Sequence, residues 1–136
     1  MEIEKQEVLT FPEGLPAFED FTQFILIDYP DNPMFQFLQS IEKSHIAFLI
    51  IQPWSFFPEY DIQLSKEDLE DLTIRDKGQV ITYNIVTLSN MGDQLNMTAN
   101  LLAPIIINKE NSKAKQIILT QEQYHTKHPI LEIKEG

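Results

Sequence analysis

Runs of alternating apolar and polar residues, separated by turn-forming residues, recur along most of the chain. In residues 79–89, Val80 and Val86 would lie on one face of an extended chain, and Ile81 and Ile85 on the other. A period of two is typical of β-strands, and the intervening Pro, Gly, Asn and Asp residues favour turns. We therefore expect strands at residues 22–29, 34–41, 46–52, 79–89, 97–108 and 116–120. Short strands spaced in this way predict a mainly antiparallel sheet in a small β-barrel or β-sandwich-like single domain.

Two features interrupt the strand pattern. Pro104 falls inside the run at 97–108, so we expect an edge, bend or bulge there. The segment from Ser65 to Leu72 predicts one short helix, because Ser65-Lys-Glu-Asp68 matches a capping box and acidic residues crowd its first turns. Leu69 and Leu72 would pack this helix on the sheet. A second short turn is expected at residues 120–124.

Length and composition predict one folded domain. The chain has 136 residues, of which 43% are hydrophobic and 23% charged, as in ordinary globular proteins. We place the domain at residues 1–130 and a short C-terminal tail at 131–136. The absence of cysteine excludes disulfide scaffolds, thiolate zinc sites and cysteine nucleophiles. The sequence has neither the start of a signal peptide nor an apolar run of ~20 residues, which predicts a cytoplasmic protein without a membrane partner.

The charge distribution is uneven. The chain carries 10 basic and 21 acidic residues, a formal net charge of -11. Residues 1–76 contain 16 acids and 4 bases, whereas residues 77–136 contain 5 acids and 6 bases. A negative field repels phosphate backbones, so direct nucleic-acid binding is disfavoured, and it attracts a basic protein partner. Solubility alone is the alternative explanation of the charge.

The sequence lacks the usual catalytic motifs, including phosphate-binding glycine loops, the nucleophile elbow and zinc-binding His-Glu motifs. His125 and His128 could share a metal only on a helix, and Pro129 favours an extended chain. We therefore expect a solvated segment there, without metal or cofactor. The acid pairs Glu19–Asp20 and Glu59/Asp61 would need an apolar cleft to act as acid and base. We predict a protein that is not an enzyme; a small-molecule hydrolase using carboxylates in a barrel mouth is the alternative.

Aromatic residues are concentrated in one part of the chain. Of 9 Phe, 4 Tyr and 1 Trp, seven fall in a stretch of 26 residues: Phe35, Phe37, Phe48, Trp54, Phe56, Phe57 and Tyr60. The segment from Pro53 to Pro58 is bounded by prolines and predicts a loop. Its rings either fold back over the barrel core or form a hydrophobic contact surface for another protein, where Trp and Tyr contribute much of the affinity.

Several motifs, in order, resemble the bacterial flagellar assembly factor FliW family. They are Phe11-Pro-Glu-Gly-Leu-Pro-Ala-Phe-Glu19, Phe37-Leu-Gln-Ser40, Ala47-Phe48, Thr98-Ala-Asn-Leu-Leu-Ala-Pro-Ile-Ile-Ile-Asn108, Gln116-Ile-Ile-Leu119 and Tyr124-His-Thr-Lys-His-Pro129. The resemblance extends from about Phe11 to Ile130. It implies a small β-barrel-like, cytoplasmic regulator that binds flagellin and the translational repressor CsrA. When flagellin is exported, the freed factor would capture CsrA and so relieve repression of flagellin mRNA.

The residues themselves indicate where such partners would bind. Repressor binding is expected at acids of the first half of the chain: Glu19, Asp20, Asp31, Glu59 and Asp61. Flagellin binding is expected at an apolar surface: Phe35, Trp54, Phe56, Phe57, Asn100 and Leu101. An export chaperone that binds flagellin alone is a further alternative.

Overall fold

The computed structural model describes residues 8–15, 18–91 and 94–130, and these residues form a mainly β fold. The strands are β1 (Leu9–Thr10), β2 (Gln23–Asp28), β3 (Phe35–Ser40), β4 (Ala47–Ile51), β5 (Val80–Met91), β6 (Gln94–Ala99), β7 (Ile105–Asn108), β8 (Lys113–Gln116) and β9 (His128–Pro129). The helical elements are the α-helix α1 (Lys66–Asp71) and the 3-10 turns η1 (Pro53–Ser55) and η2 (Lys77–Gln79). The predicted fold class is confirmed. The predicted tail at 131–136 lies outside the described residues.

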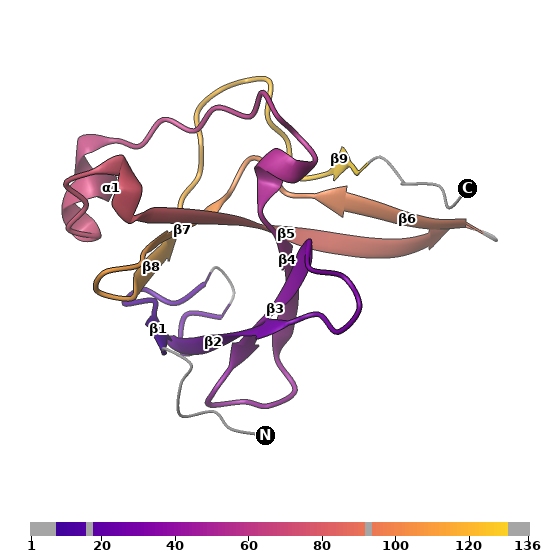
Figure 1. Cartoon of the computed structure of the whole chain (residues 1–136), viewed down its shortest axis with the longest axis horizontal. Coiled ribbons are helices and arrows are strands. Elements are labelled where there is room, and N and C mark those ends of the chain that lie inside the picture. Colours follow the sequence, from indigo (N-terminus) through magenta and orange to yellow (C-terminus); the bar gives the residue numbers. More distant parts are fainter. Residues whose placement is uncertain (1–7, 16–17, 92–93, 131–136) are drawn as a thin grey trace.

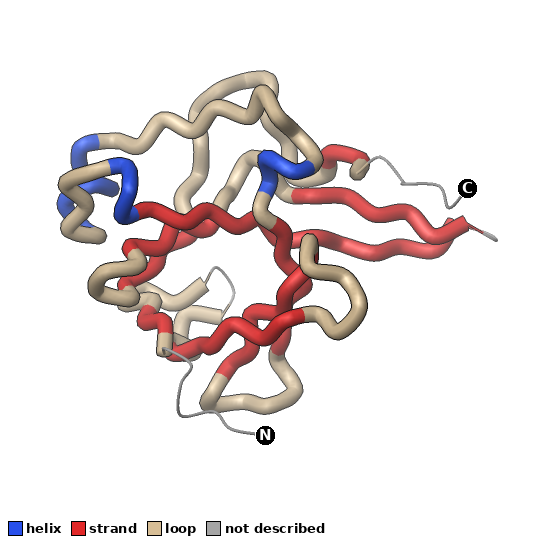
Figure 2. The backbone as a smooth tube through the Cα atoms, viewed as in Figure 1, coloured by secondary structure: helices blue, strands red, loops and turns tan. Residues whose placement is uncertain are grey.

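The sheet closes into a barrel. Its strand order is β4-β3-β2-β1-β8-β7-β5-β6-β9, and an additional pairing of β4 with β5 completes the ring visible in Figure 2. Every pairing between strands is antiparallel except that of β1 with β8, where Thr10 lies opposite Lys113. The long strand β5 belongs both to the barrel, where its start pairs with β7, and to a hairpin, where its end pairs with β6. The β5–β6 hairpin projects from the barrel, with β9 along its edge (Figure 1).

Strand β7 shows that the barrel wall separates two hydrophobic cores. Successive side chains of a strand point to opposite faces, yet all four residues of β7 are buried. Ile105 and Ile107 belong to the inner core, which fills the barrel, and Ile106 belongs to the outer core on the opposite face of the wall. The inner core consists of Leu9, Phe11, Leu15, Phe24, Leu38, Ile50, Tyr83, Ile105, Ile107 and Ala114. The outer core consists of Ile51, Tyr60, Leu72, Val86, Ala99, Leu101, Ile106, Ile117, Leu119, Tyr124 and Ile130.

Two long irregular segments cover the outer core. One runs from β4 to α1 and the other from β8 to β9, and both cross the top of the molecule in Figure 1. Tyr60 is a buried residue of the first segment, and Leu119 and Tyr124 are buried residues of the second. The two segments are joined where the hydroxyl of Tyr124 accepts a hydrogen bond from the backbone N–H of Asp61 at 2.8 Å.

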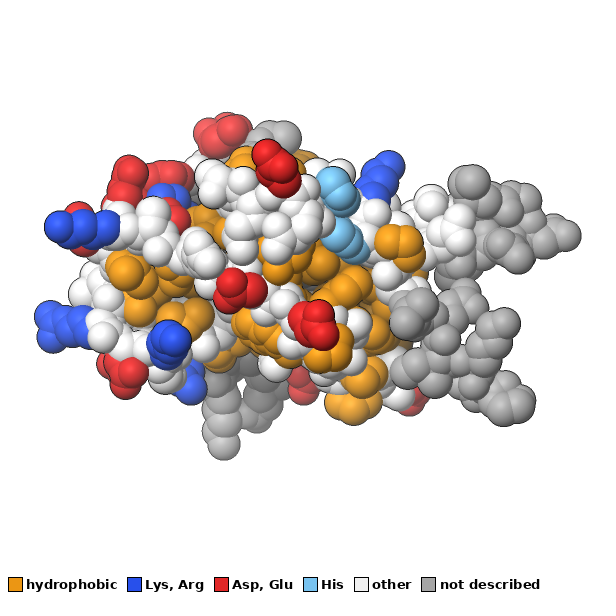
Figure 3. Space-filling view, turned by 90° about the horizontal axis from the view of Figure 1, so that it is seen from above, with side chains coloured by type: hydrophobic (Ala, Val, Ile, Leu, Met, Phe, Trp, Pro, Cys, Tyr) orange, Lys and Arg blue, Asp and Glu red, His pale blue; other side chains and the backbone are white. Residues whose placement is uncertain are grey.

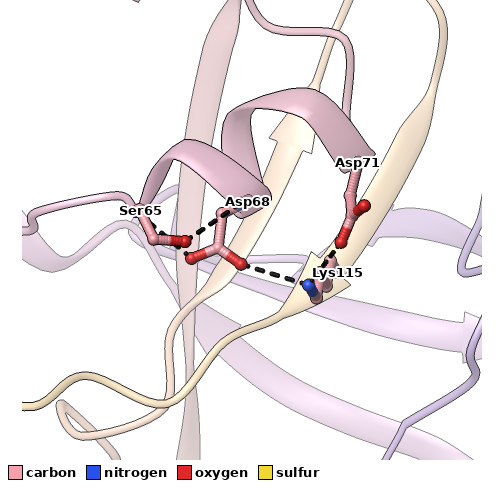
Figure 4. A network of polar contacts seen from close by, with 4 residues as sticks. All are labelled: Ser65, Asp68, Asp71 and Lys115. Atoms are coloured by element: carbon pink, nitrogen blue, oxygen red, sulfur yellow. Dashed lines mark hydrogen bonds and ion pairs between the residues drawn. The ribbon is translucent and has the colours of Figure 1, made fainter.

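Helix α1 begins as the sequence predicts. The Ser65 hydroxyl accepts a hydrogen bond from the Asp68 N–H at 3.0 Å, and the Asp68 carboxylate accepts one from the Ser65 N–H at 3.4 Å. Lys115 of β8 forms ion pairs with Asp68 at 3.1 Å and Asp71 at 2.8 Å (Figure 4). The hydrogen bond that Lys115 donates to the Asp71 carboxylate is the main reason that the pKa of Lys115 is raised. Leu72, at the C-cap, is 1% exposed, so it fastens the helix to the outer core.

The strand boundaries predicted from the sequence differ from the observed ones for the two strands expected after residue 97. The run at 97–108 forms two strands, β6 and β7, because the Asn100 side chain closes a turn by accepting a hydrogen bond from the Ala103 N–H at 3.0 Å. The strand expected at 116–120 is instead β8, at Lys113–Gln116. A tight turn that ends with Ser112 at φ 61 places Lys113 opposite Asn108, which fixes this earlier register. The short turn expected at residues 120–124 is present, because the Tyr124 N–H donates to the Gln121 carbonyl at 3.3 Å.

Candidate functional site

The aromatic segment (residues 53–60) is a compact series of turns that begins at Pro53. Proline suits the first position of a helical turn because its φ is already fixed and its missing N–H is not needed there. The Pro53 carbonyl accepts hydrogen bonds from the N–H groups of Phe56 at 3.0 Å and Phe57 at 2.7 Å. The Tyr60 N–H then donates to the Phe57 carbonyl at 3.0 Å. The loop expected here is therefore held in one conformation by its own backbone.

The rings of this segment cover the outer core and leave one large side chain exposed. Phe56 and Phe57 are half-buried against the outer core. The Phe56 ring lies 5.9 Å from that of Phe35 on β3. The Trp54 side chain is 45% exposed, and its indole N–H donates to the Tyr60 carbonyl at 2.8 Å. The segment therefore covers the outer core and, at the same time, presents a fixed indole at the surface.

A buried polar network lies beneath the aromatic segment. The Tyr60 hydroxyl donates to the Leu101 carbonyl at 2.6 Å and accepts from the Asn84 side-chain amide at 3.2 Å. The same amide donates to the Asn100 carbonyl at 2.8 Å. Burial raises the pKa of Tyr60, so its hydroxyl keeps the proton that it donates. The network attaches the aromatic segment to the Asn100–Leu101 turn.

An open groove of about 520 Å³ runs between the aromatic segment and α1. The groove has mainly apolar walls and a charged rim. The space-filling view of the top of the molecule shows apolar side chains exposed among charged ones (Figure 3). One wall comes from residues 54–64, the other from residues 69–77, and the floor from Val80, Thr82 and Ile106. Asp61 contributes to the first wall, and Arg75, Asp76 and Lys77 to the second. A volume of this size is in the usual range of ligand-binding clefts, roughly 300–1,000 Å³.

The five acids expected to bind the repressor are all exposed, but they belong to three different loops. Glu19 and Asp20 lie in a turn before β2, and Asp31 lies in the turn between β2 and β3. Glu59 lies near the end of the aromatic segment, and Asp61 directly follows the segment and lines the groove.

The six residues expected to bind flagellin differ widely in exposure. Trp54 is the most exposed, and Phe35, Phe56 and Phe57 are half-buried. Asn100 is half-buried, with its side-chain oxygen occupied by the Ala103 N–H. Leu101 is only 2% exposed and belongs to the outer core, so in this conformation it supports the surface from below.

The groove does not resemble a carboxylate-based active site. Its two carboxylates, Asp61 and Asp76, are exposed at the rim, whereas a general acid or base of raised pKa needs an apolar enclosure. The mouth of the barrel offers no alternative among the described residues, because aliphatic and aromatic side chains fill its interior. No observation favours the hydrolase alternative.

The expectation of a solvated segment at His125 and His128 is wrong for His128. His128 is half-buried in β9, opposite Ala99 of β6, and its Nε2 accepts a hydrogen bond from the His125 N–H at 2.8 Å. The two rings are stacked with centroids 5.2 Å apart. Burial and the neighbouring His125 lower the pKa of His128. The described residues contain no cluster of three or more His, Cys, Asp or Glu side chains that could hold a metal.

Sequence reasoning missed an exposed aromatic row beside Phe35. Tyr29 is 41% exposed, and its ring lies 6.0 Å from Phe35 and 5.6 Å from Phe37. Met34, in the turn directly before β3, is 37% exposed. The signal was present in the sequence, because Tyr29 and Phe37 belong to two predicted strands joined by a short turn. Side chains on the same face of two such strands contact each other across the pair.

Together these features define a class: a small closed β-barrel with a filled interior, whose surface carries a fixed aromatic segment and an open groove. No helix in the described part of the chain is long and apolar enough to cross a membrane. A family model described as "FliW protein" matches residues 1–130. The chain therefore belongs to the FliW family.

Individual relatives agree with this assignment over nearly the full chain. The flagellar assembly factor FliW of Alkaliphilus metalliredigens is 44% identical over 133 residues, which cover 97% of this chain and 81% of that protein. The flagellar assembly factor FliW of Thermoanaerobacter pseudethanolicus is 41% identical over 133 residues, covering 97% and 87%. A crystal structure of the flagellar assembly factor FliW superposes with a TM-score of 0.85 at 36% identity, covering 98% of this chain and 93% of that one.

Proposed function

We propose that this chain is a cytoplasmic flagellar assembly factor that binds flagellin and CsrA in turn. While flagellin is abundant in the cell, it occupies the factor. Once flagellin is exported, the free factor binds CsrA, and translation of flagellin mRNA resumes. Membership in a family whose relatives are flagellar assembly factors supports the first part of this proposal.

The observation that carries the proposal is the fixed, half-exposed indole of Trp54 beside exposed acids. Trp54 is held by its hydrogen bond to Tyr60, so little side-chain entropy is lost when a partner covers it. Large aromatic side chains of this kind dominate many protein interfaces. We propose that Trp54, Phe35, Phe56 and Phe57 contact flagellin, with the Asn100–Leu101 turn supporting them.

The acidic residues suit a basic second partner. A protein that represses translation by binding RNA needs a positively charged surface. Glu59 and Asp61, close to Trp54 in sequence, would contact CsrA from the same side of the molecule as the aromatic segment. Glu19, Asp20 and Asp31 would add to the long-range attraction that speeds the encounter.

A competition experiment tests the proposal. The chain is first mixed with labelled CsrA until a complex forms, and purified flagellin is then added. We expect flagellin to release CsrA, and Trp54→Ala to weaken flagellin binding while the fold is retained. Titration with CsrA alone separates this function from that of a chaperone that binds only flagellin, because such a chaperone would leave CsrA free. Failure of both partners to bind would contradict the proposal.

A further inference from the structure

We infer that the groove between the aromatic segment and α1 takes an amphipathic helix of a partner protein, with leucine-like residues on one face and carboxylates beside them. This inference goes beyond the proposed function, because it concerns the chemistry of the whole groove that Trp54 and Asp61 border, and it holds whichever protein supplies the helix.

The walls of the groove account for the apolar part of this preference. Trp54, Ile62 and Leu64 line one side, and Leu69 and Ile74 line the other. Ile62, Leu64 and Ile74 pack against the outer core but stay partly exposed, so covering them would remove further apolar surface from water. Leucine-like side chains are the natural complement of such a surface.

The floor of the groove favours a helix over an extended peptide. Thr82 of β5 and Ile106 of β7 lie opposite each other in the antiparallel ladder, and Val80 pairs with Asn108 in the same ladder. The backbone groups of the floor are thus committed to β5–β7 pairing and could not hold an added strand. A helix satisfies its own backbone and needs only apolar contact from the groove.

The charges on the rim of the groove account for the carboxylates of the proposed helix. The rim carries two acids and two bases: Asp76 accepts from the Gly78 N–H at 3.4 Å and Asp61 accepts from the Gln63 side chain at 3.3 Å, and these neutral donors leave both carboxylates charged. Arg75 and Lys77 form no ion pair with any residue in the described ranges, where both ion pairs belong to Lys115. In a chain with 21 acids and 10 bases, two free cations beside an apolar groove point to a negatively charged ligand group.

The backbone that carries the two cations is held by its own turn. The side-chain oxygen of Gln79 accepts hydrogen bonds from the N–H groups of Arg75 at 2.7 Å and Asp76 at 2.9 Å. The Gln79 amide in turn donates to Glu110 at 2.9 Å. Because the backbone at residues 75–79 is fixed in this way, both cations are presented at the rim before any ligand arrives.

Two synthetic peptides test the inference directly. The first has leucine at positions i, i+3, i+4 and i+7 with glutamate at flanking positions, and the second carries glutamine in place of every glutamate. Neither contains Trp, so emission from Trp54, the single tryptophan of the chain, reports occupancy of the groove. At about 0.15 M salt, where long-range repulsion is screened, we expect the glutamate peptide to bind about threefold to tenfold more tightly.

Charge-neutralising variants locate the preference. The double variant Arg75→Gln/Lys77→Gln should bind the two peptides equally. The control Lys109→Gln/Lys113→Gln makes the same charge change away from the groove lining and should keep the preference. Circular dichroism checks that both variants fold. Equal binding of the two peptides by the unaltered chain, an equal loss of preference in both double variants, or no change in Trp54 emission would overturn the inference. Because the assay uses neither flagellin nor CsrA, its outcome is independent of the proposed function.

Discussion

The two hydrophobic cores of this barrel are enclosed in different ways. The inner core is surrounded by the barrel strands, with Phe11 and Leu15 contributed by the segment between β1 and β2, and the rings of Phe11 and Phe24 pack edge to face at 5.2 Å. The outer core has the sheet on one side and irregular segments on the other. It also contains a polar network that links Tyr60 to Asn84, and the Asn84 side-chain oxygen has no hydrogen-bond partner among the described residues.

This difference separates the scaffold from the surface that can bind partners. The exposed indole of Trp54, the groove and the acids at residues 59 and 61 all lie on the cover of the outer core. Loops held by a rigid sheet are where proteins commonly place binding residues. The closed barrel fixes the sheet, and the segments that cover the outer core can vary in side-chain chemistry without changing the fold.

The strongest way to test the comparison is to remove one ring from each core. Phe24 is 0% exposed in the inner core, so Phe24→Ala should lower the free energy of unfolding by about 3–5 kcal/mol. Phe57 is half-buried over the outer core, so Phe57→Ala should cost about 1–2 kcal/mol. Urea denaturation measures both. Equal losses would show that the outer cover is as tightly packed as the barrel interior.

The polar network of the outer core provides the next test. In Tyr60→Phe, the Leu101 carbonyl loses its hydrogen-bond donor and the Asn84 amide loses one acceptor. Leaving buried polar groups unsatisfied should lower the free energy of unfolding by about 1–3 kcal/mol. Tyr29→Phe, at an exposed position, is the matched control and should change it by less than about 0.5 kcal/mol. If Tyr60→Phe behaves like this control, the hydroxyl does not hold the aromatic segment in place.

A smaller effect is expected at the helix that borders the groove. Ser65→Ala removes the hydroxyl that caps α1, which should lower the free energy of unfolding by about 1 kcal/mol. Ser44→Ala, at an exposed loop serine, is the control and should have almost no effect. Thermal unfolding followed by circular dichroism measures both variants. A loss of similar size in the control would mean that the cap itself contributes nothing specific.

The features that sequence analysis predicted correctly are those that depend on near neighbours. The capping box at Ser65 and the alternation along β5 require only residues that are close in the chain. The features it missed depend on distant residues. The parallel pairing of β1 with β8, at Thr10 and Lys113, joins residues far apart in the chain, and no local pattern indicates it.

The candidate site shows the same division. Proline-flanked aromatic residues indicated a loop at residues 53–58, where Pro53–Ser55 instead form the 3-10 turn η1 and only the rest is irregular, and the expected acids are exposed. The burial of Leu101 was missed because the Tyr60 hydroxyl that contacts its carbonyl comes from a position 41 residues earlier. The groove was missed for a related reason, since its walls come from two segments and its floor from two strands that meet only in the folded chain.

The smallest predicted effect distinguishes the two cores by their response to pH. The hydrogen bond from the His125 N–H to His128 Nε2 requires a neutral His128 ring, and the pKa of His128 is lowered by burial and by His125. The groups that pack against this ring are Phe57, Tyr124 and His125. Because the folded chain takes up this proton less readily than the unfolded chain, the stabilisation is complete above the ordinary histidine pKa of about 6.5.

As the pH falls below that value and through the lower folded pKa, the stabilisation is lost. We therefore expect the melting temperature to fall between pH 7.5 and pH 5.5 by more in the unaltered chain than in His128→Gln, whose side-chain oxygen accepts a hydrogen bond at either pH. The matched control His45→Gln changes an exposed histidine in the loop between β3 and β4 and should retain the full pH response. An identical response in the unaltered chain and His128→Gln would show that the outer core does not depend on the protonation of His128. The difference between the two cores would then lie in packing alone.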